Sequence, residues 1–127
     1  MRTQDELLER FNDLLDLRAD RLECGDGWID IIWEALEKIE KCEKPSPDWK
    51  IQIIKEKFGG LRIQSFGFNQ ETDDIINLAE RKSAYVCEVC GSNTGTHKKK
   101  NGWLKTICDK CDKYHDEKGV YPLSERV

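Results

Sequence analysis

The sequence lacks several features that would assign it at once to a class of protein. No apolar run approaches the ~20 residues that a membrane-spanning helix needs, so we predict none. No signal peptide is predicted either, because the first residues, Met1 to Glu6, are polar and acidic; we therefore expect a reducing, intracellular setting. A Ser/His/Asp set, a glycine-rich phosphate loop and a defined carboxylate pair are also missing, so we expect a protein that is not an enzyme.

An excess of positive charge is missing as well. The 127 residues carry a net charge of −4. Residues 1–84 hold 13 basic against 19 acidic side chains, whereas residues 85–127 hold 8 against 6. Proteins built to wrap nucleic acid are usually more basic than this. The length suits one domain, or one domain with a small module.

The cysteines, in contrast, follow an informative pattern. Four of the six cysteines form two C-x2-C pairs, Cys87 with Cys90 and Cys108 with Cys111, and seventeen residues separate the pairs. This spacing is typical of a tetrahedral zinc site. Gly91 follows the first pair, where a zinc knuckle needs a residue without Cβ. The sequence therefore predicts one Zn²⁺.

Two disulfides are the competing interpretation of these cysteines, and a reducing setting disfavours them. A metal ion enclosed by four thiolates has no open position for water or substrate. The predicted zinc is therefore structural and not catalytic.

The N-terminal half is predicted to begin with two helices. A capping box at Thr3 and Glu6, followed by apolar residues at helical spacing, predicts a first helix over 4–22. A second apolar stripe predicts a helix over 27–42, which ends before Pro45 because proline cannot continue helical hydrogen bonding.

A β-hairpin is expected to follow these helices. Residues 49–54 and 61–66 are rich in β-branched side chains, and we place a primed turn at Gly59-Gly60, where positive φ is needed. A two-stranded sheet is too small to stand alone, so we expect the helices to cover one face of it. The side chains expected in the resulting core are Trp28, Ile32, Leu36 and Ile53.

The remaining elements lead into the metal site. A third helix is predicted over 72–84, then the knuckle, a short hairpin through Asn101-Gly102, and a final helix that starts near Cys108. This order resembles a treble clef, in which the second cysteine pair lies on the first helical turn and the helix dipole stabilises thiolate charge. We therefore predict an α+β protein with two parts, a helical and β-hairpin domain over 1–84 and a zinc-binding, treble-clef-like or zinc-ribbon module over 85–127.

The other cysteines and the two histidines receive no metal role. Cys24 and Cys42 have no second thiol at metal spacing and are interpreted as core or incidental surface thiols. His97 and His115 are spare once four cysteines serve as ligands. A ββα-metal nuclease uses a similar module, but His97 lacks the Asp-His pair that such an enzyme needs.

Two surfaces are candidates for binding a partner. The first is a basic and aromatic cluster on the zinc hairpin, which either contacts phosphates and stacks on bases or is a solvated tip with its tryptophan packed over the zinc; its residues are Lys98, Lys99, Lys100, Lys105 and Trp103. The second is the set Lys55, Lys57 and Arg62 around the Gly-Gly turn, which binds an anion or a protein or only solvates an edge. The acidic first helix either is solvated or complements a basic partner.

A family resemblance adds to this interpretation. Gly27-Trp28, the segment Lys55-Glu-Lys-Phe-Gly-Gly-Leu-Arg62, the Cys87 knuckle and Gly102-Trp103 together resemble a family of small zinc-ribbon proteins from bacteriophages and phage-derived bacterial islands, over roughly residues 25–112. The resemblance transfers no activity. It implies expression in the cytoplasm of a bacterial host and an accessory protein that blocks a host factor.

The predicted function is thus a zinc-stapled binding protein that engages or inhibits a host macromolecule, with a protein partner favoured. One alternative is a nucleic-acid-binding regulator that uses the zinc hairpin, and a weaker one is a sponge for an anionic nucleotide. The predicted partner-binding residues are Lys55, Lys57, Arg62, Lys98, Lys99, Lys100 and Trp103.

Overall fold

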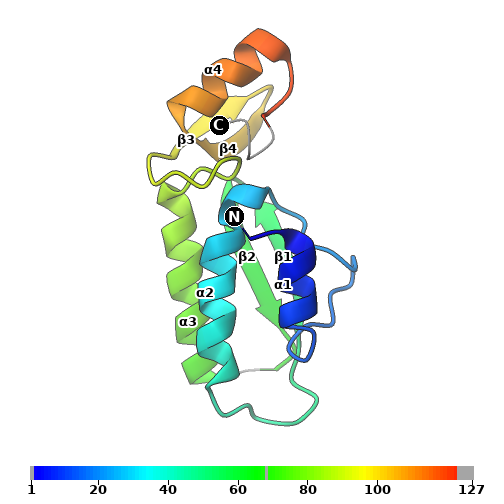
Figure 1. The fold of residues 1–127 in the computed structure, drawn as a ribbon. Helices are drawn as coiled ribbons and strands as arrows, with labels where there is room; N and C mark the ends of the chain where they lie inside the picture. The colour runs from blue at the N-terminus through cyan, green and yellow to red at the C-terminus, as the bar shows by residue number, and fades with distance from the viewer. Residues whose placement is uncertain (1, 68, 123–127) are drawn as a thin grey trace.

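The computed structural model describes residues 2–67 and 69–122 and confirms the α+β class (Figure 1). A larger part contains helices α1 (Gln4–Arg10), α2 (Ile29–Glu40) and α3 (Gln70–Lys82) with the antiparallel strands β1 (Ile51–Lys57) and β2 (Gly60–Ser65). A smaller part, stacked on one end of it, contains the hairpin β3 (Thr96–Lys100) and β4 (Trp103–Ile107) with helix α4 (Asp109–Lys118). Two 3-10 turns, η1 (Asp26–Trp28) and η2 (Ser83–Tyr85), precede α2 and follow α3.

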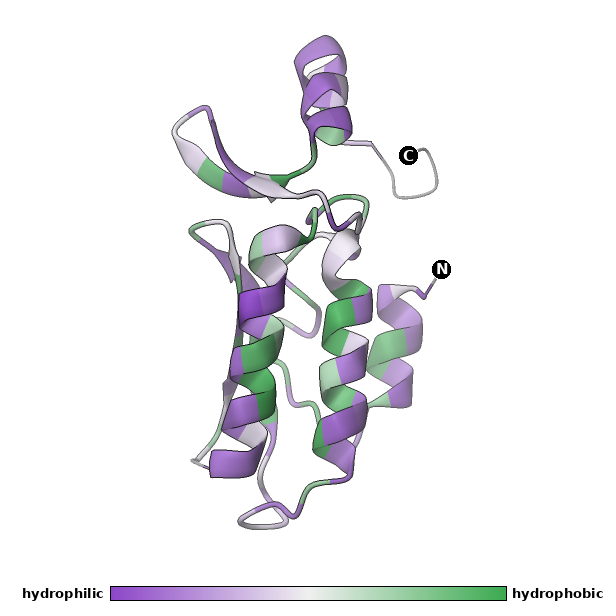
Figure 2. Ribbon diagram, turned by 90° about the vertical axis from the view of Figure 1, so that its left-hand side faces the viewer, coloured by the Kyte–Doolittle hydropathy of each residue, from purple (hydrophilic) through white to green (hydrophobic). Residues whose placement is uncertain are grey.

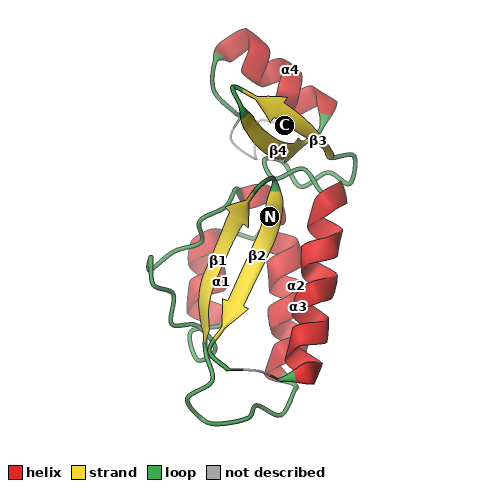
Figure 3. Ribbon diagram, turned by 180° about the vertical axis from the view of Figure 1, so that it is seen from behind, coloured by secondary structure: helices red, strands yellow, loops and turns green. Residues whose placement is uncertain are grey.

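The helices of the larger part all lie on one face of the β1–β2 hairpin. Figure 3, seen from behind, shows the two strands in front of the helices with no element covering their outer face. Hydrophobic segments recur along α1, α2 and α3 between hydrophilic ones, as amphipathic packing requires (Figure 2). The core formed in this way includes Leu7, Phe11, Trp28, Ile29, Ile32, Leu36, Ile39, Ile51, Ile54 and Leu61.

A second, smaller apolar cluster belongs to the part that holds the two cysteine pairs. It contains Cys87, Val89, Ile107, Cys108 and Cys111. The buried members of the first cluster end at Ala79, but the partly buried Val86 also packs against it, so this core reaches past residue 84. Residues 123–127 of the expected module lie outside the described residues. No helix within residues 2–67 and 69–122 is long and apolar enough to cross a membrane.

The first helix is much shorter than the predicted span of 4–22. It begins at the predicted cap, where the Thr3 hydroxyl accepts a hydrogen bond from the Glu6 N–H, but it ends at Arg10. Residues 14–23 then run beside β1, and the N–H groups of Asp16 and Glu23 donate to carbonyls of that strand at 2.9 Å. Leu14, Leu17 and Leu22 of this segment remain buried, so tertiary pairing to a strand edge overrides the helical pattern.

The first hairpin turn lies one residue earlier than predicted. Its central residues are Phe58 (φ 53) and Gly59 (φ 82), while Gly60 pairs with Lys57 as the first residue of β2. Positive φ at both central positions is the requirement of a type I′ turn. The second hairpin meets the same requirement as predicted, at Asn101 (φ 53) and Gly102 (φ 85).

The burial prediction holds for three of its four residues. Trp28, Ile32 and Leu36 are fully buried, whereas Ile53 is only half-buried. An irregularity in the strand pairing between Ile51 and Ile53 explains the difference, because it places Ile51 and Ile54 toward the helices.

Both edges of the β1–β2 hairpin are closed. Residues 14–23 cover the edge of β1. On the edge of β2, the Leu61 N–H donates to Ser83 Oγ at 3.0 Å and the Ile63 N–H donates to Glu80 Oε2 at 2.9 Å. Side chains from the end of α3 and from η2 thus take the place of a further strand.

The Ser83→Ala variant tests this closure. It removes the acceptor of the buried Leu61 N–H, and a buried donor left without a partner costs about 1–3 kcal/mol. We expect a loss of that size in the free energy of unfolding, measured with urea. Ser65→Ala is the matched control, since the Ser65 hydroxyl makes an exposed bond to the Gly67 carbonyl. Equal unfolding midpoints for the two variants would contradict the closure.

Candidate metal centre

Four cysteine side chains converge between the knuckle and the start of α4. The Sγ atoms of Cys87, Cys90, Cys108 and Cys111 all lie within 4.8 Å of one another. Zn–S bonds of ~2.3 Å in a tetrahedron put sulfurs about 3.8 Å apart, and the Cys90 and Cys108 sulfurs are separated by 3.7 Å. This is far longer than a disulfide of about 2.05 Å, and all six cysteines are free thiols. The cluster can therefore hold a metal ion.

The knuckle backbone depends on Gly91. Its φ of +82° is one that a residue with a side chain rarely adopts, and a Cβ there would lie 3.1 Å from the Gly27 carbonyl oxygen. In this conformation the Gly91 N–H donates to the Cys87 carbonyl at 2.9 Å, and the Cys87 N–H donates to the Ser92 carbonyl at 2.8 Å. The turn brings Cys87 and Cys90 to the same side, as the spacing predicts.

Helix α4 supplies the second pair from its first turn. Cys108 is the N-cap residue, and its Sγ accepts a hydrogen bond from the Cys111 N–H at 3.4 Å. Burial alone would raise the pKa of Cys108, but hydrogen bonds, first from the Cys111 backbone, lower it to about 7. Burial raises the pKa of Cys87 and of Cys111. A bound cation would stabilise all four as thiolates.

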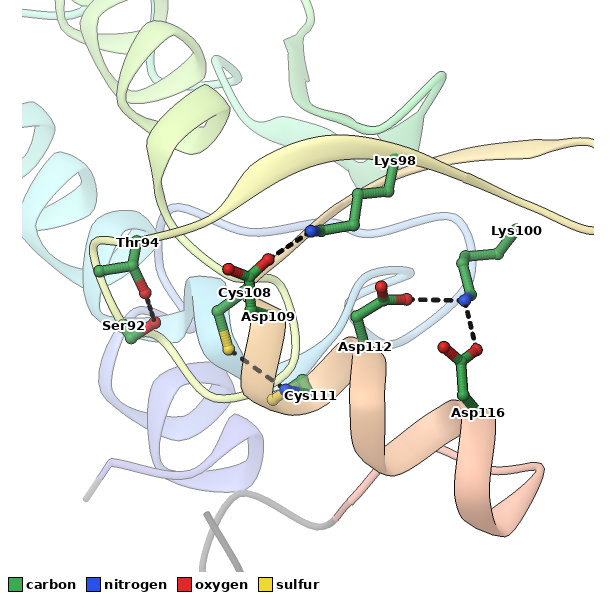
Figure 4. Close-up of polar contacts among 9 residues, drawn as sticks. All are labelled: Ser92, Thr94, Lys98, Lys100, Cys108, Asp109, Cys111, Asp112 and Asp116. Carbon is green, nitrogen blue, oxygen red and sulfur yellow. Dashed lines mark hydrogen bonds and ion pairs between the residues drawn. The ribbon is translucent and has the colours of Figure 1, made fainter.

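Helix α4 also carries acidic side chains that pair with the lysines of β3 (Figure 4). Lys98 Nζ lies 2.5 Å from Asp109 Oδ1, and Lys100 Nζ lies 2.7 Å from Asp112 and 2.6 Å from Asp116. Hydrogen bonds to these carboxylates raise the pKa of both lysines. The pairs therefore neutralise two of the three predicted phosphate contacts.

The predicted basic and aromatic cluster is therefore divided. Lys99 lies between Lys98 and Lys100 on β3, so its side chain points to the opposite face of the hairpin. Lys105 Nζ pairs with Glu88 Oε1 at 3.1 Å. The Trp103 side chain is 77% exposed, which shows that the alternative of a tryptophan packed over the metal site is wrong.

Sequence reasoning missed the residues that dock the knuckle onto the larger part. The Gly27 N–H donates to the Glu88 carbonyl at 2.7 Å, the Gly25 N–H donates to Glu88 Oε2 at 2.8 Å, and Trp28 Nε1 donates to the Val86 carbonyl at 2.8 Å. The Glu88 side chain is only 5% exposed, and its second oxygen accepts from Lys105. Glu88 thus joins the metal centre to residues 25–28.

Gly27 is confined by this docking. A Cβ at Gly27 would lie 2.1 Å from the Cys87 carbonyl oxygen, which no side chain can tolerate without movement of the knuckle. The signal in the sequence is the crowding of Gly25, Gly27 and Trp28 within four residues.

The remaining cysteines and histidines do not join the cluster. Cys24 is half-buried, and burial raises its pKa to about 12. Cys42 Sγ donates to the Lys38 carbonyl at 3.3 Å. His115 stacks on Tyr121 with ring centroids 4.4 Å apart, and His97 is exposed on β3.

The β1–β2 hairpin brings together the second predicted set of binding residues, Lys55, Lys57 and Arg62. Strand register places Lys55 opposite Arg62 and Lys57 opposite Gly60. Directly paired residues, and residues two apart on one strand, share a face. Lys55, Lys57 and Arg62 therefore lie on the uncovered face of the β1–β2 hairpin, and in the described part of the chain no ion pair involves them.

In comparisons with known proteins, no family model, curated protein or solved structure matches this chain. The resemblance to a phage zinc-ribbon family therefore stays a prediction.

Proposed function

We propose that the protein is a non-enzymatic binding protein, held in shape by one structural Zn²⁺, that engages another protein. The observation that carries the proposal is the placing of two aromatic side chains. Phe58 is 72% exposed and Trp103 is 77% exposed, and each lies at the turn of a hairpin. Aromatic side chains are enriched in protein interfaces and among the residues that dominate their affinity.

Zinc is the metal that best suits the cluster. Thiolate ligands select soft or borderline metals, and Zn²⁺ favours a tetrahedral set of four. Cys87, Cys90, Cys108 and Cys111 would hold it and leave no position for substrate, so the ion would supply folding energy only. We place the protein in the cytoplasm of a bacterial host, in accord with the phage resemblance and the free thiols.

Pairing of the zinc-hairpin lysines counts against nucleic acid as the main partner. A phosphate that reached Lys98 or Lys100 would have to displace a carboxylate from 2.5–2.7 Å. A nucleic-acid regulator therefore stays the second candidate, and a sponge for an anionic nucleotide at Lys55, Lys57 and Arg62 stays the third.

The nucleic-acid candidate makes a separate prediction. We expect only weak binding to duplex DNA, unchanged when Lys98, Lys99 and Lys100 are all replaced by glutamine, because two of these lysines are already paired. Fluorescence anisotropy between about 50 and 200 mM salt measures this, with an expected slope of about −0.9 per phosphate contact. Sub-micromolar binding whose slope flattens in the triple variant would favour the nucleic-acid regulator instead.

Capture from a bacterial lysate tests the proposed function directly. Zinc-loaded protein serves as bait and Cys111→Ser protein as the matched control. One half of the captured material is assayed for nucleic acid and nucleotides, and cross-linked protein partners are identified by mass spectrometry in the other half after nuclease treatment. We expect a discrete protein in near-stoichiometric amount with the zinc-loaded bait only. Recovery of nucleic acid or nucleotides without a protein partner would contradict the proposal.

A further inference from the structure

We propose that the uncovered face of the β1–β2 hairpin binds an acidic protein segment that carries an apolar residue, with Lys55, Lys57 and Arg62 as its charge contacts and Phe58 as its apolar anchor. We call these four residues the hairpin face. The inference rests on the proposed function, because it names the partner chemistry of a binding protein.

The hairpin face is open, whereas the hairpin edges are not. Ile54, Leu61 and Ile63 are buried, so the alternate residues point away from the core. They face the side of the hairpin on which Figure 3 shows no helix. The edge of β1 is bonded to residues 14–23, and the N–H groups on the edge of β2 donate to Ser83 and Glu80. A partner therefore meets side chains on this face and cannot add a strand to the sheet.

The positive charge of the hairpin face favours a negatively charged partner. Lys98, Lys100 and Lys105 each pair with a carboxylate, although their part of the chain is slightly basic. Lys55, Lys57 and Arg62 have no such pair among the described residues, although residues 1–84 hold six more acidic than basic side chains. Lys55 and Arg62 also lie directly opposite each other, and like charges in that position are unfavourable. Carboxylates from a partner would relieve this repulsion.

Phe58 occupies a position that its side chain does not favour. Its φ of 53° lies in the left-handed region, where a bulky residue is an outlier. The matching position of the other hairpin turn, with the same φ, is Asn101, and asparagine is a residue that such turns prefer. Because the Phe58 ring is 72% exposed, burial within this chain does not offset the strain. Strain of this kind gathers at functional sites.

The turn that carries Phe58 is fixed by contacts with β4. The Thr106 hydroxyl of β4 donates to the Gly59 carbonyl at 2.6 Å in a buried bond, and a Cβ on Gly59 would contact the Leu104 backbone at 3.3 Å. Lys57 Nζ lies 5.6 Å from the centre of the Phe58 ring. A fixed anchor loses little freedom on binding, which favours affinity.

An acidic protein segment fits this face better than nucleic acid. A base could stack on Phe58, but a long polyanion would also meet the field of a net acidic domain. Glu56 lies between Lys55 and Lys57 in the sequence, and Glu23 pairs with Lys55 through the backbone. A short segment with a few carboxylates around one apolar side chain makes the favourable contacts without extending over these acids.

Selection from a displayed library of random peptides tests the inference with zinc-loaded full-length protein. We expect enrichment of peptides in which Asp or Glu flanks an aromatic or aliphatic residue. Phe58→Asn should weaken the best peptide about tenfold or more, while its melting temperature stays equal or rises, because asparagine suits the turn. Reversal of Lys55, Lys57 and Arg62 to glutamate should also weaken binding at least about tenfold. Tyr85→Ala and Lys113→Glu are the matched controls and should bind as the wild type does, because Tyr85 is an exposed aromatic residue of η2 and Lys113 is an exposed lysine of α4.

Several results would overturn the inference. They are an enriched set without acidic residues, wild-type affinity in Phe58→Asn, and tighter binding of single-stranded oligothymidine than of any peptide. If the charge-reversed variant fails to fold, Phe58→Asn decides alone. A lysate protein captured equally by wild type and Phe58→Asn would contradict the hairpin face and leave the proposed function standing. Acidic peptides that bind as expected, without any captured lysate protein, would support the face and contradict the proposed function.

Discussion

Replacement of Cys111 by serine is expected to abolish metal binding and to unfold residues 87–118. The Cys111 side chain is fully buried within the four-sulfur cluster, and a serine hydroxyl does not replace a thiolate ligand. Zinc binding in small modules contributes ~10–16 kcal/mol of folding free energy at pH 7. Elemental analysis should give one zinc per wild-type chain and none per variant chain. Hydrogen exchange should show rapid exchange over 87–118 in the variant.

Cys42→Ser is the control for this prediction. Cys42 is also buried, but it lies outside the cluster and bonds to the Lys38 carbonyl. We expect this variant to keep its zinc and its exchange protection in the metal module. Wild-type protein produced in zinc-replete medium without bound zinc would refute the metal site itself, and full protection in Cys111→Ser would refute its structural role.

Trp28→Ala is expected to have the second largest effect, a loss of ~3–5 kcal/mol in the free energy of unfolding. The Trp28 side chain is fully buried among the helices and the hairpin, and its indole N–H donates to the Val86 carbonyl. The variant therefore loses core contacts and one of the bonds to the knuckle together. Urea unfolding at saturating zinc measures the change.

Trp28→Phe separates the two contributions. It keeps an aromatic ring in the core and removes the donor to Val86, at an expected cost of about 1–3 kcal/mol. A Trp28→Ala protein as stable as Trp28→Phe would show that the ring is not packed as the structure has it.

Sequence patterns predicted those parts of the fold that depend on near neighbours in the chain. The apolar stripe of α2 and the cysteine spacing each specify their structure locally. The helix is confirmed, and the cysteines are confirmed to form a cluster that is able to hold a metal ion. The end of α1 could not be predicted, because Leu14 and Leu22 fit a helix as well as they fit the edge of β1. That choice depends on a strand that begins at residue 51.

Contacts between residues remote in sequence also explain why the roles of Glu88 and Phe58 could not be predicted. A glutamate between two ligand cysteines is expected to be solvated, and only Gly25 and Lys105, both remote in sequence, make Glu88 a buried residue. The turn at Phe58 was placed at Gly59-Gly60 because local preference excludes a phenylalanine with positive φ. The position where local preference failed is also the one that we propose as an anchor.

Docking of the knuckle on Gly25 and Trp28 has a consequence for the order of events during synthesis. The bonds from these residues to Glu88 and Val86 span 63 and 58 residues, and the last ligand, Cys111, follows later still. At ~5–20 residues per second, the ribosome adds Cys111 about 4–17 s after it has made Trp28. Val86, which supplies the acceptor of the indole N–H, is made about 3–12 s after Trp28 at that rate, so the N-terminal half completes its contacts only when the first cysteine pair is being made. Metal uptake at the four cysteines, as we propose it, would therefore complete the folding of the whole chain rather than of its C-terminal part alone.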